Sequence, residues 1–279
     1  MRAETSRFSR FLPSEDIMMW KTSEVIDPSR EMDEREWWNF WNTSYRAADD
    51  LDAIASELFA RAASEVNSIT ETGGCRVLEV ACGSGAFSRL LHYSSYHGID
   101  ISPAAIDIAR QKAESVVVRE GAARPTYEAA DFHDWPLPPQ TFDVTVCIDA
   151  ISSIRDQRLA LEKMARSLGD SGRLVLTTVN PFVYDRIKRT HSRPLSVGPV
   201  SRWLTRSELR ALIQLAGFTI ERSYTIMPRG NLGVLRLLNS WRLNRAFGRR
   251  VEMVLRRLKE RVGLGQYSVV VARKAGNGG

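Results

Sequence analysis

The chain has 279 residues, 43% hydrophobic and 26% charged, a balance that argues against a largely disordered protein. Its three cysteines exclude a disulfide-rich scaffold and favour a reducing compartment, and no segment approaches the roughly 20 apolar residues that a spanning helix needs. The start of the chain lacks the apolar core of a secretory signal, so we expect a cytoplasmic protein, with peripheral membrane contact left open.

Residues 1–70 are predicted to form an N-terminal arm followed by a helical lid. Asp33 and Glu36 have the spacing of a capping box, which predicts a helix that begins here. That helix carries four aromatic residues close together, Trp37, Trp38, Phe40 and Trp41. A second helix is expected over 49–68, where apolar residues recur every three or four positions. The aromatic cluster is expected either to cover a ligand mouth or to pack on the sheet.

Residues 71–226 are predicted to form the core, in which short apolar segments alternate with helical patterns. The expected strands are 76–82, 96–101, 126–132, 142–148, 173–179 and 218–227, and the expected helices are 86–93, 103–118, 156–168 and 207–216. A seventh strand is expected over 266–273, within a final segment 266–279. Strands separated by helices indicate an α/β fold: a Rossmann-like, seven-stranded, mostly parallel sheet with helices on both faces.

The positive charge of the chain is concentrated before the last predicted strand. Residues 227–265 hold ten basic and two acidic residues, a net charge of +8, whereas the rest of the chain has a net charge of −2. The segment also has two apolar stripes at helical spacing, so we expect a helical insert that covers the substrate. The same pattern suits contact with an anionic membrane surface or RNA, and a solvated helical face is the simpler alternative.

Three consecutive predicted strands end in residues that suit an adenosine. The first ends in Glu79-Val-Ala-Cys-Gly83-Ser-Gly85, where two glycines let the backbone approach a ligand closely. The second ends at Asp100, whose carboxylate can accept both hydroxyls of a ribose. The third ends at Asp131-Phe132, which suits an adenine amino group and its ring. Because open α/β sheets bind ligands at the carboxyl ends of their strands, we expect these groups to share one site.

The sequence of the glycine turn helps to distinguish between two classes of nucleotide ligand, dinucleotides and S-adenosylmethionine (SAM). A dinucleotide site has the pattern G-x-G-x-x-G, but here Ser88 occupies the position of the third glycine. Glu79 would repel a pyrophosphate and attract a cationic group. We therefore favour SAM, which is cationic and carries no phosphate, over NAD. A turn that binds no ligand remains an alternative.

The segments Val77–Gly85 and His97–Pro103 resemble the first two motifs of the class I SAM-dependent methyltransferases, with Ala81 where many members have glycine. Segments 130–132 and 142–149 resemble the third and fourth motifs, and the turn at 168–172 resembles the one before the family's fifth strand. The resemblance covers residues 40–274 and is closest in character to ubiquinone-biosynthesis-like small-molecule methyltransferases. It implies SAM as cofactor, S-adenosylhomocysteine as product, and a seventh strand inserted antiparallel beside the sixth.

The resemblance also implies a set of cofactor-binding positions and no metal. These positions are Tyr45, Glu79, Ala81, Gly83, Gly85, Asp100, Ile101, Asp131, Phe132, Ile148 and Asp149. The first strand and its turn should line the methionine part, Asp100 should hold the ribose, and Ile101, Asp131 and Phe132 should surround the adenine. Ile148 and Asp149 should lie at the reacting end, and Tyr45 resembles an aromatic residue that closes over SAM.

The expected reaction is methylation of a hydroxyl on a small aromatic or hydrophobic molecule, which requires a base. His191 is the first candidate for the catalytic base because it lies in the irregular stretch after the fifth strand; His133 and Asp149 are others. Asn180-Pro181-Phe182 resembles an amino-methyltransferase motif but follows the wrong strand, so a nucleic-acid acceptor is disfavoured. A small-amine N-methyltransferase, an RNA methyltransferase and a non-catalytic SAM-binding protein remain alternatives.

Overall fold

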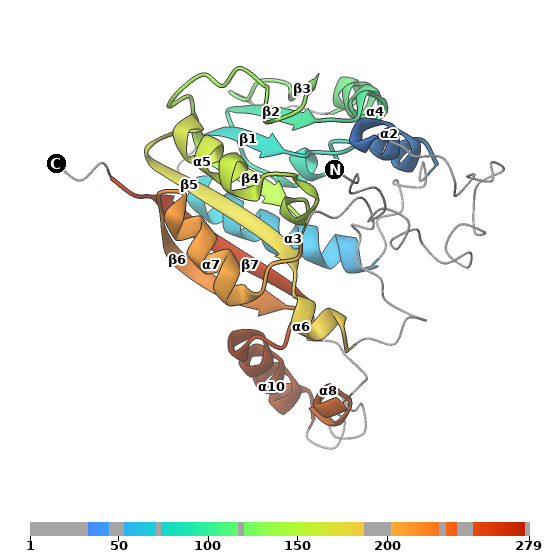
Figure 1. Cartoon of the computed structure of the whole chain (residues 1–279), viewed down its shortest axis with the longest axis vertical. Coiled ribbons are helices and arrows are strands. Elements are labelled where there is room, and N and C mark those ends of the chain that lie inside the picture. Colours follow the sequence, from blue (N-terminus) through green and yellow to red (C-terminus); the bar gives the residue numbers. More distant parts are fainter. Residues whose placement is uncertain are drawn as a thin grey trace, which may run out of the picture.

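The fold is built on one seven-stranded sheet with the order β3-β2-β1-β4-β5-β7-β6, seen in a computed structural model (Figure 1). The structure describes residues 33–44, 53–70, 74–116, 120–186, 202–228, 233–238 and 248–276. The strands are β1 (Arg76–Val80), β2 (Ser95–Asp100), β3 (Thr126–Ala129), β4 (Phe142–Ile148), β5 (Leu168–Val179), β6 (Phe218–Ile226) and β7 (Tyr267–Lys274).

The strand directions confirm a mostly parallel sheet with an antiparallel last strand. β1 pairs in parallel with β2 and β4, so that Glu79 lies beside Gly98 on one side and Val146 on the other. β7 lies between β5 and β6 and runs antiparallel to both. Its first six residues are all buried, which fits a strand with neighbours on both edges and side chains covered on both faces.

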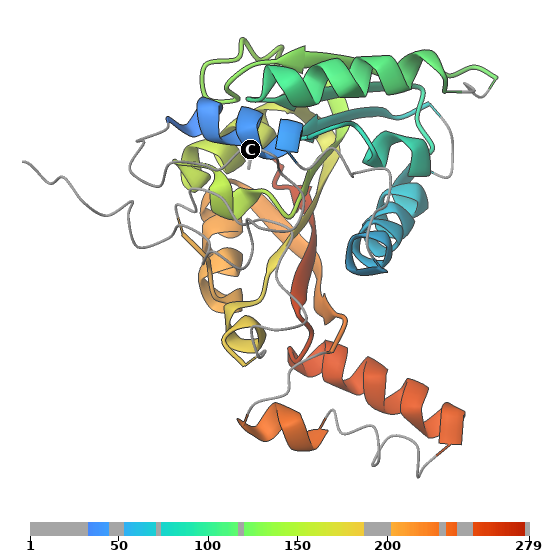
Figure 2. The same cartoon turned by 90° about the vertical axis from the view of Figure 1, so that its right-hand side faces the viewer.

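Helices cover both faces of the sheet because adjacent strand residues point to opposite sides. Val77 packs in the apolar cluster under α3 (Ala53–Thr70) and α4 (Pro103–Glu114). Leu78 packs in a second cluster, under α5 (Gln157–Ser167) and α7 (Arg206–Leu215). Figure 2 shows α3 and α7 on opposite sides of the sheet.

Three helices begin at side-chain caps, and the first of these is the capping box predicted at Asp33 and Glu36. At α2 (Glu34–Ser44), Glu36 N–H donates to Asp33 Oδ1 at 2.8 Å and Asp33 N–H donates to Glu36 Oε2 at 3.3 Å. Ser102 accepts from the Ala105 N–H at the start of α4. Thr205 and Glu208 form the capping box of α7. Each cap satisfies amides that the first helical turn leaves without an intrahelical partner.

The helix expected over 86–93 is wrong: the structure has a short 3-10 helix, η2 (Phe87–Leu90), followed by extended backbone at Leu91. Only the nine residues 86–94 connect Gly85 to β2, and they must return to the amino edge of the sheet. The five residues of β1 span about 16 Å at roughly 3.3 Å each. Nine α-helical residues cover about 13 Å and would leave none for the turns at either end, so a regular α-helix does not fit this connection.

Other differences from the sequence predictions are smaller. The stretch expected to be irregular after β5 contains a short helix, α6 (Pro181–Tyr184). η3 (Ile151–Ser153) follows β4. The basic insert contains α8 (Gly233–Leu238) and α10 (Gly248–Val262), which lie beyond the β6–β7 end of the sheet (Figure 1). Within the described ranges, no helix combines the length and apolarity needed to cross a bilayer.

Candidate functional site

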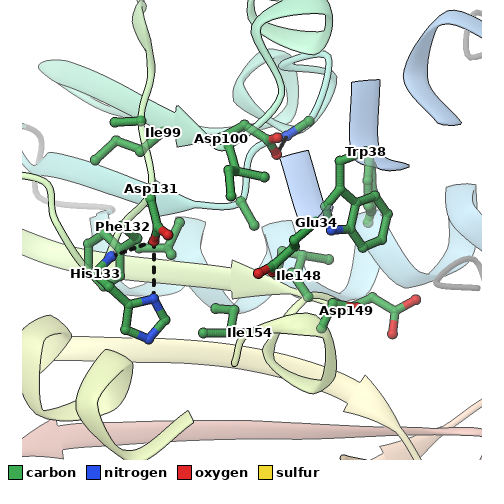
Figure 3. A pocket seen from close by; sticks show the side chains of 18 residues that line it. Glu34, Trp38, Ile99, Asp100, Asp131, Phe132, His133, Ile148, Asp149 and Ile154 are labelled. Carbon is green, nitrogen blue, oxygen red and sulfur yellow. Dashed lines mark hydrogen bonds and ion pairs between the residues drawn. The ribbon is translucent and has the colours of Figure 1, made fainter. Parts of the chain in front are cut away.

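A cavity of about 230 Å³ opens at the carboxyl edge of the sheet. The ends of β1, β2 and β4 and the turn after β3 form its floor, and α2 contributes Glu34 and Trp38 (Figure 3). Phe59 of α3 and Ile154, just after η3, complete the wall. The strand ends that the sequence predicts to cooperate therefore do converge on one cavity.

Asp100 holds the glycine turn against the end of β2. Its Oδ2 accepts from the Gly83 N–H at 2.8 Å, and its Oδ1 accepts from the Ser102 N–H at 2.9 Å. Burial raises the pKa of Asp100, and the two hydrogen bonds partly offset that effect. Gly83 has a φ of +51°, and a Cβ at this position would meet no atom within 4 Å. The turn therefore leaves the space above Gly83 open.

Two non-glycine residues with left-handed backbone lie at the floor of the cavity. Ala81 has a φ of +59° and Asp149 a φ of +53°. Such conformations are costly for residues with a Cβ and cluster at functional sites. They explain why glycine is common at the position of Ala81. The Asp149 backbone N–H donates to both the carbonyl and the hydroxyl of Thr177 at 3.0 Å, which fixes the turn after β4.

A charged network joins the turn after β3 to the lid helix. Asp131 Oδ1 contacts His133 Nδ1 at 3.1 Å and accepts from the His133 N–H at 2.9 Å (Figure 3). Arg155 bridges Asp131 Oδ2 at 2.6 Å and Glu34 Oε2 at 3.1 Å. Burial acts to raise the pKa of Asp131, but the hydrogen bonds from His133 and the charge of Arg155 lower it. Burial raises the pKa of Glu34, against the opposing effect of Arg155.

Helix α2 is also fixed at a second point, against the start of α4. Asn39 Oδ1 accepts from the Ser102 hydroxyl at 2.9 Å and from the Ala104 N–H at 3.2 Å. With Glu34 paired to Arg155, these contacts hold the face of α2 that carries Trp38 over the cavity. Helix α2 therefore borders the cavity, and its role as a lid remains a prediction.

Glu79 lies beneath the cavity and is not among the residues that line it. It is 2% exposed and contacts the hydroxyl of Tyr96. Burial raises its pKa to about 8, although the hydrogen bond from Tyr96 acts in the opposite direction. Gly85 does not line the cavity either: a Cβ there would lie 2.7 Å from the Tyr127 hydroxyl. The roles of Glu79 and Gly85 toward a ligand remain predictions.

The cavity is acidic and apolar. Four carboxylates line it, those of Glu34, Asp100, Asp131 and Asp149, and no lysine or arginine occurs among the described residues of the lining. Ile99, Ile101, Ile148, Ile154, Trp38 and Phe132 supply most of the remaining surface. Such a lining suits a ligand with hydroxyls, positive charge and an aromatic ring. It is unfavourable for phosphate groups, which proteins bind with cations or exposed helix amides.

The structure brings together eight of the residues that the sequence predicts for the cofactor. These are Ala81, Gly83, Asp100, Ile101, Asp131, Phe132, Ile148 and Asp149. Tyr45 and the candidate base His191 lie outside the described residues. Sequence reasoning missed Glu34, Phe59, Ile154 and Arg155. A capping box placed Glu34 at a helix start, but no sequence pattern connected it to the distant Arg155.

The described parts of 227–265 do not line this cavity. The substrate-covering role expected for the insert therefore remains a prediction.

The chain matches the family described as methyltransferase domain over residues 41–223, more than half its length. It therefore belongs to that family and is a class I SAM-dependent methyltransferase. It is 23% identical over 215 residues to the mitochondrial ubiquinone biosynthesis O-methyltransferase of Schizosaccharomyces pombe, a match that covers 76% of each protein. Two further curated methyltransferases match over 47% and 50% of their own length, so the chain spans about half of each.

Solved structures show the same fold. The SAM-dependent methyltransferase from Mesorhizobium loti superposes with a TM-score of 0.51 at 19% identity, over 76% of this chain and 96% of that one. The [4+2]-cyclase SpnF superposes with a TM-score of 0.54 at 20% identity, over 78% and 82%. At these identities the likeness extends to the architecture and not to the acceptor.

Proposed function

We propose that the cavity binds SAM and that the enzyme methylates a hydroxyl of a small aromatic or hydrophobic molecule. Asp100 would hold the ribose hydroxyls, Phe132 and Ile101 would pack on the adenine, and Asp131 would face its amino group. The open space above Gly83 would accept the methionine part. SAM supplies the activated methyl group, and the protein's contribution is to align the acceptor and exclude water.

The observation that carries this proposal is the charge of the lining. Four carboxylates and no lysine or arginine face the cavity among its described residues. Each carboxylate attracts the cationic groups of SAM and repels the pyrophosphate of a dinucleotide. The turn Gly83-Ser-Gly85 also lacks the third glycine of a dinucleotide site.

The apolar part of the cavity supports a small hydrophobic acceptor. Trp38, Ile148 and Ile154 lie near the reacting end of β4 and offer no charged group to a nucleic-acid backbone. The relative from S. pombe is named an O-methyltransferase of ubiquinone biosynthesis, which supports a hydroxyl of a small molecule as the acceptor class. We infer a small-molecule partner on this basis.

Among the described candidate bases, Asp149 is better placed than His133. His133 Nδ1 faces Asp131 at 3.1 Å and Nε2 faces the Asp156 carbonyl at 3.1 Å, so both ring nitrogens are directed at protein acceptors. That arrangement gives His133 a structural role beside Asp131. Asp149 is 6% exposed, lines the cavity and follows β4 directly, where an acceptor hydroxyl could reach it. We therefore propose Asp149 as the base among the described candidates.

The test is calorimetric binding of S-adenosylhomocysteine and of NAD. The wild-type protein should bind S-adenosylhomocysteine and not NAD. Asp100→Asn should weaken S-adenosylhomocysteine binding by at least about ten-fold, because a carboxylate accepts from hydroxyls more strongly than an amide does. Asp107→Asn, on the exposed side of α4, is the matched control and should leave the affinity unchanged.

Because Asp100 also holds the glycine turn, the melting temperature of each variant must be measured alongside. Equal affinities for wild type and Asp100→Asn, with both folded, would place the cofactor elsewhere. NAD binding at this cavity would overturn the proposal.

A further inference from the structure

Helix α10 turns Arg256 and Glu260 toward the rest of the protein. Glu260 is 7% exposed, and its backbone carbonyl accepts from the Thr225 hydroxyl at 2.7 Å. Arg256 pairs with Glu260 Oε1 at 3.1 Å and with Glu57 of α3. Arg61 of α3 lies 3.7 Å from Glu260. Ion pairs and a hydrogen bond, rather than an apolar face alone, therefore hold α10 against α3 and β6.

The opposite face of α10 exposes apolar side chains to solvent. Val254, Leu258 and Val262 are 65%, 55% and 59% exposed. Val254, Leu258 and Val262 recur every four residues and so form one row along the helix. Single exposed apolar residues are ordinary, but a contiguous row marks an interaction surface. We refer to Val254, Leu258 and Val262 as the α10 apolar stripe.

Positive charge borders the stripe. Arg257 and Arg261 are exposed and lie three residues after Val254 and Leu258, on the adjacent side of the helix. Among the side chains of α10 that the structure describes, the only acid is Glu260, which is buried and paired. The exposed face therefore combines apolar side chains with arginines and presents no acid among its described residues.

We propose that the α10 apolar stripe docks on an anionic phospholipid surface. Apolar side chains of such a helix enter the boundary between headgroups and acyl chains, while flanking arginines bind lipid phosphates. RNA would engage the arginines but leave the stripe in water. A second copy of the chain would cover the stripe but bring two arginine-rich helices together. The lipid surface alone satisfies both features.

The position of the insert in the fold gives a functional reason for membrane docking. β7 is antiparallel to both β5 and β6, so β6 ends at the same sheet edge as β4 and β5, where the cavity opens. The insert leaves the core from the end of β6 (Figure 2). A membrane held by α10 would therefore lie toward the sheet edge at which the cavity opens. The docking itself does not depend on the proposed acceptor or on SAM.

The test is co-sedimentation of the full chain with vesicles, without SAM. Wild type should bind vesicles of phosphatidylcholine with phosphatidylserine and bind phosphatidylcholine alone much more weakly. The double variants Val254→Asn/Leu258→Asn and Arg257→Gln/Arg261→Gln should each reduce binding to the anionic vesicles by at least about ten-fold. The matched control Arg210→Gln/Leu215→Asn, on the exposed face of α7, should bind as wild type does.

The substituted side chains are exposed, so melting temperatures should change little in all three variants. Wild type that ignores anionic vesicles, or stripe variants that bind them as well as wild type does, would overturn the proposal. A stripe-dependent dimer, or RNA binding with a steep salt dependence and no vesicle binding, would assign the surface to those partners instead.

Discussion

Arg155 connects the lid helix to the turn that is predicted to face adenine. Its guanidinium bridges Glu34 of α2 and Asp131 after β3, although 121 positions separate Arg155 from Glu34 in the chain. The Asp131 side chain is 15% exposed and the Glu34 side chain 24%. Because water screens these carboxylates less than it screens surface acids, the charge of Arg155 stabilises them more strongly. Without Arg155, the two acids would repel each other across the cavity.

We predict that Arg155→Gln weakens S-adenosylhomocysteine binding by about three- to ten-fold, because α2 would lose one of its two anchoring contacts and cover the ligand less of the time. Stopped-flow measurement should assign the loss to faster dissociation. Arg158→Gln is the control, since Arg158 pairs with Glu162 within α5. Equal dissociation rates in wild type and Arg155→Gln would show that the bridge does not hold the lid.

At the scale of elements, the turn between β1 and η2 contains one glycine that faces open cavity space and one that packs against the core. Gly83 and Gly85 both have left-handed backbone, with φ of +51° and +71°. A side chain at Gly83 would point into open space, whereas one at Gly85 would collide with the hydroxyl of Tyr127, 2.7 Å away, and with Ala109 at 2.9 Å. The two glycines therefore serve different purposes despite their shared conformation.

We predict that alanine has different effects at these two positions. Gly83→Ala should cost about 1–2 kcal/mol of stability from the positive φ alone, and it should weaken S-adenosylhomocysteine binding because the new methyl group occupies ligand space. Gly85→Ala should lower the melting temperature considerably more, because the same strain adds to a core clash. Thermal unfolding and calorimetry of the pair would check this. A larger stability loss for Gly83→Ala than for Gly85→Ala would contradict it.

The basic insert, residues 227–265, shows that hydrophobic periodicity predicts a helix but not which of its faces is buried. The sequence correctly indicates amphipathic helices in 227–265, and α10 has apolar residues at helical spacing. Periodicity was expected to direct the apolar stripe inward. Glu57 and Arg61 of α3, which belong to a different part of the chain, instead attract the polar side of α10. The sequence of the insert alone could not reveal that partner.

For the molecule as a whole, Glu79 makes stability depend on pH. Its carboxyl has a pKa of 4.5 when exposed and about 8 in the folded state, because burial disfavours its charge. The folded state therefore retains a proton that the unfolded chain releases between these values. The contribution of this group to the free energy of unfolding is fully present below pH 4.5. It declines as the pH rises toward 8, by up to about 1.4 kcal/mol per pH unit.

We predict that Glu79→Gln flattens the fall in melting temperature over this pH range, since a neutral amide cannot titrate. Calorimetric melting at closely spaced pH values would measure the slope. Glu114→Gln, at the exposed end of α4, should keep the wild-type slope. Parallel curves for wild type and Glu79→Gln would mean that Glu79 stays ionised in the folded protein.

Much of the candidate site was predictable because its signals are local. Glu79 lies near the end of β1, Asp100 ends β2 and Asp131 follows β3 closely, and parallel topology carries such strand ends to one edge. The short return at 86–94 was not predicted, because local helical preference does not encode the distance to the next strand. The exclusion of Glu79 from the lining depends on side-chain packing with Tyr96, which no spacing rule describes.

The sequence by itself determined the strand alternation, the helix caps, the glycine turn and the order of acids along the sheet edge, since each depends on neighbours within a few residues. Only the tertiary structure decided that Arg155 joins Glu34 to Asp131 beside the cavity and that α10 faces solvent with its apolar stripe. These features arise from contacts between segments far apart in the chain. A side-chain pattern shows that a helix has two faces, but the partner that packs against it selects which one is buried.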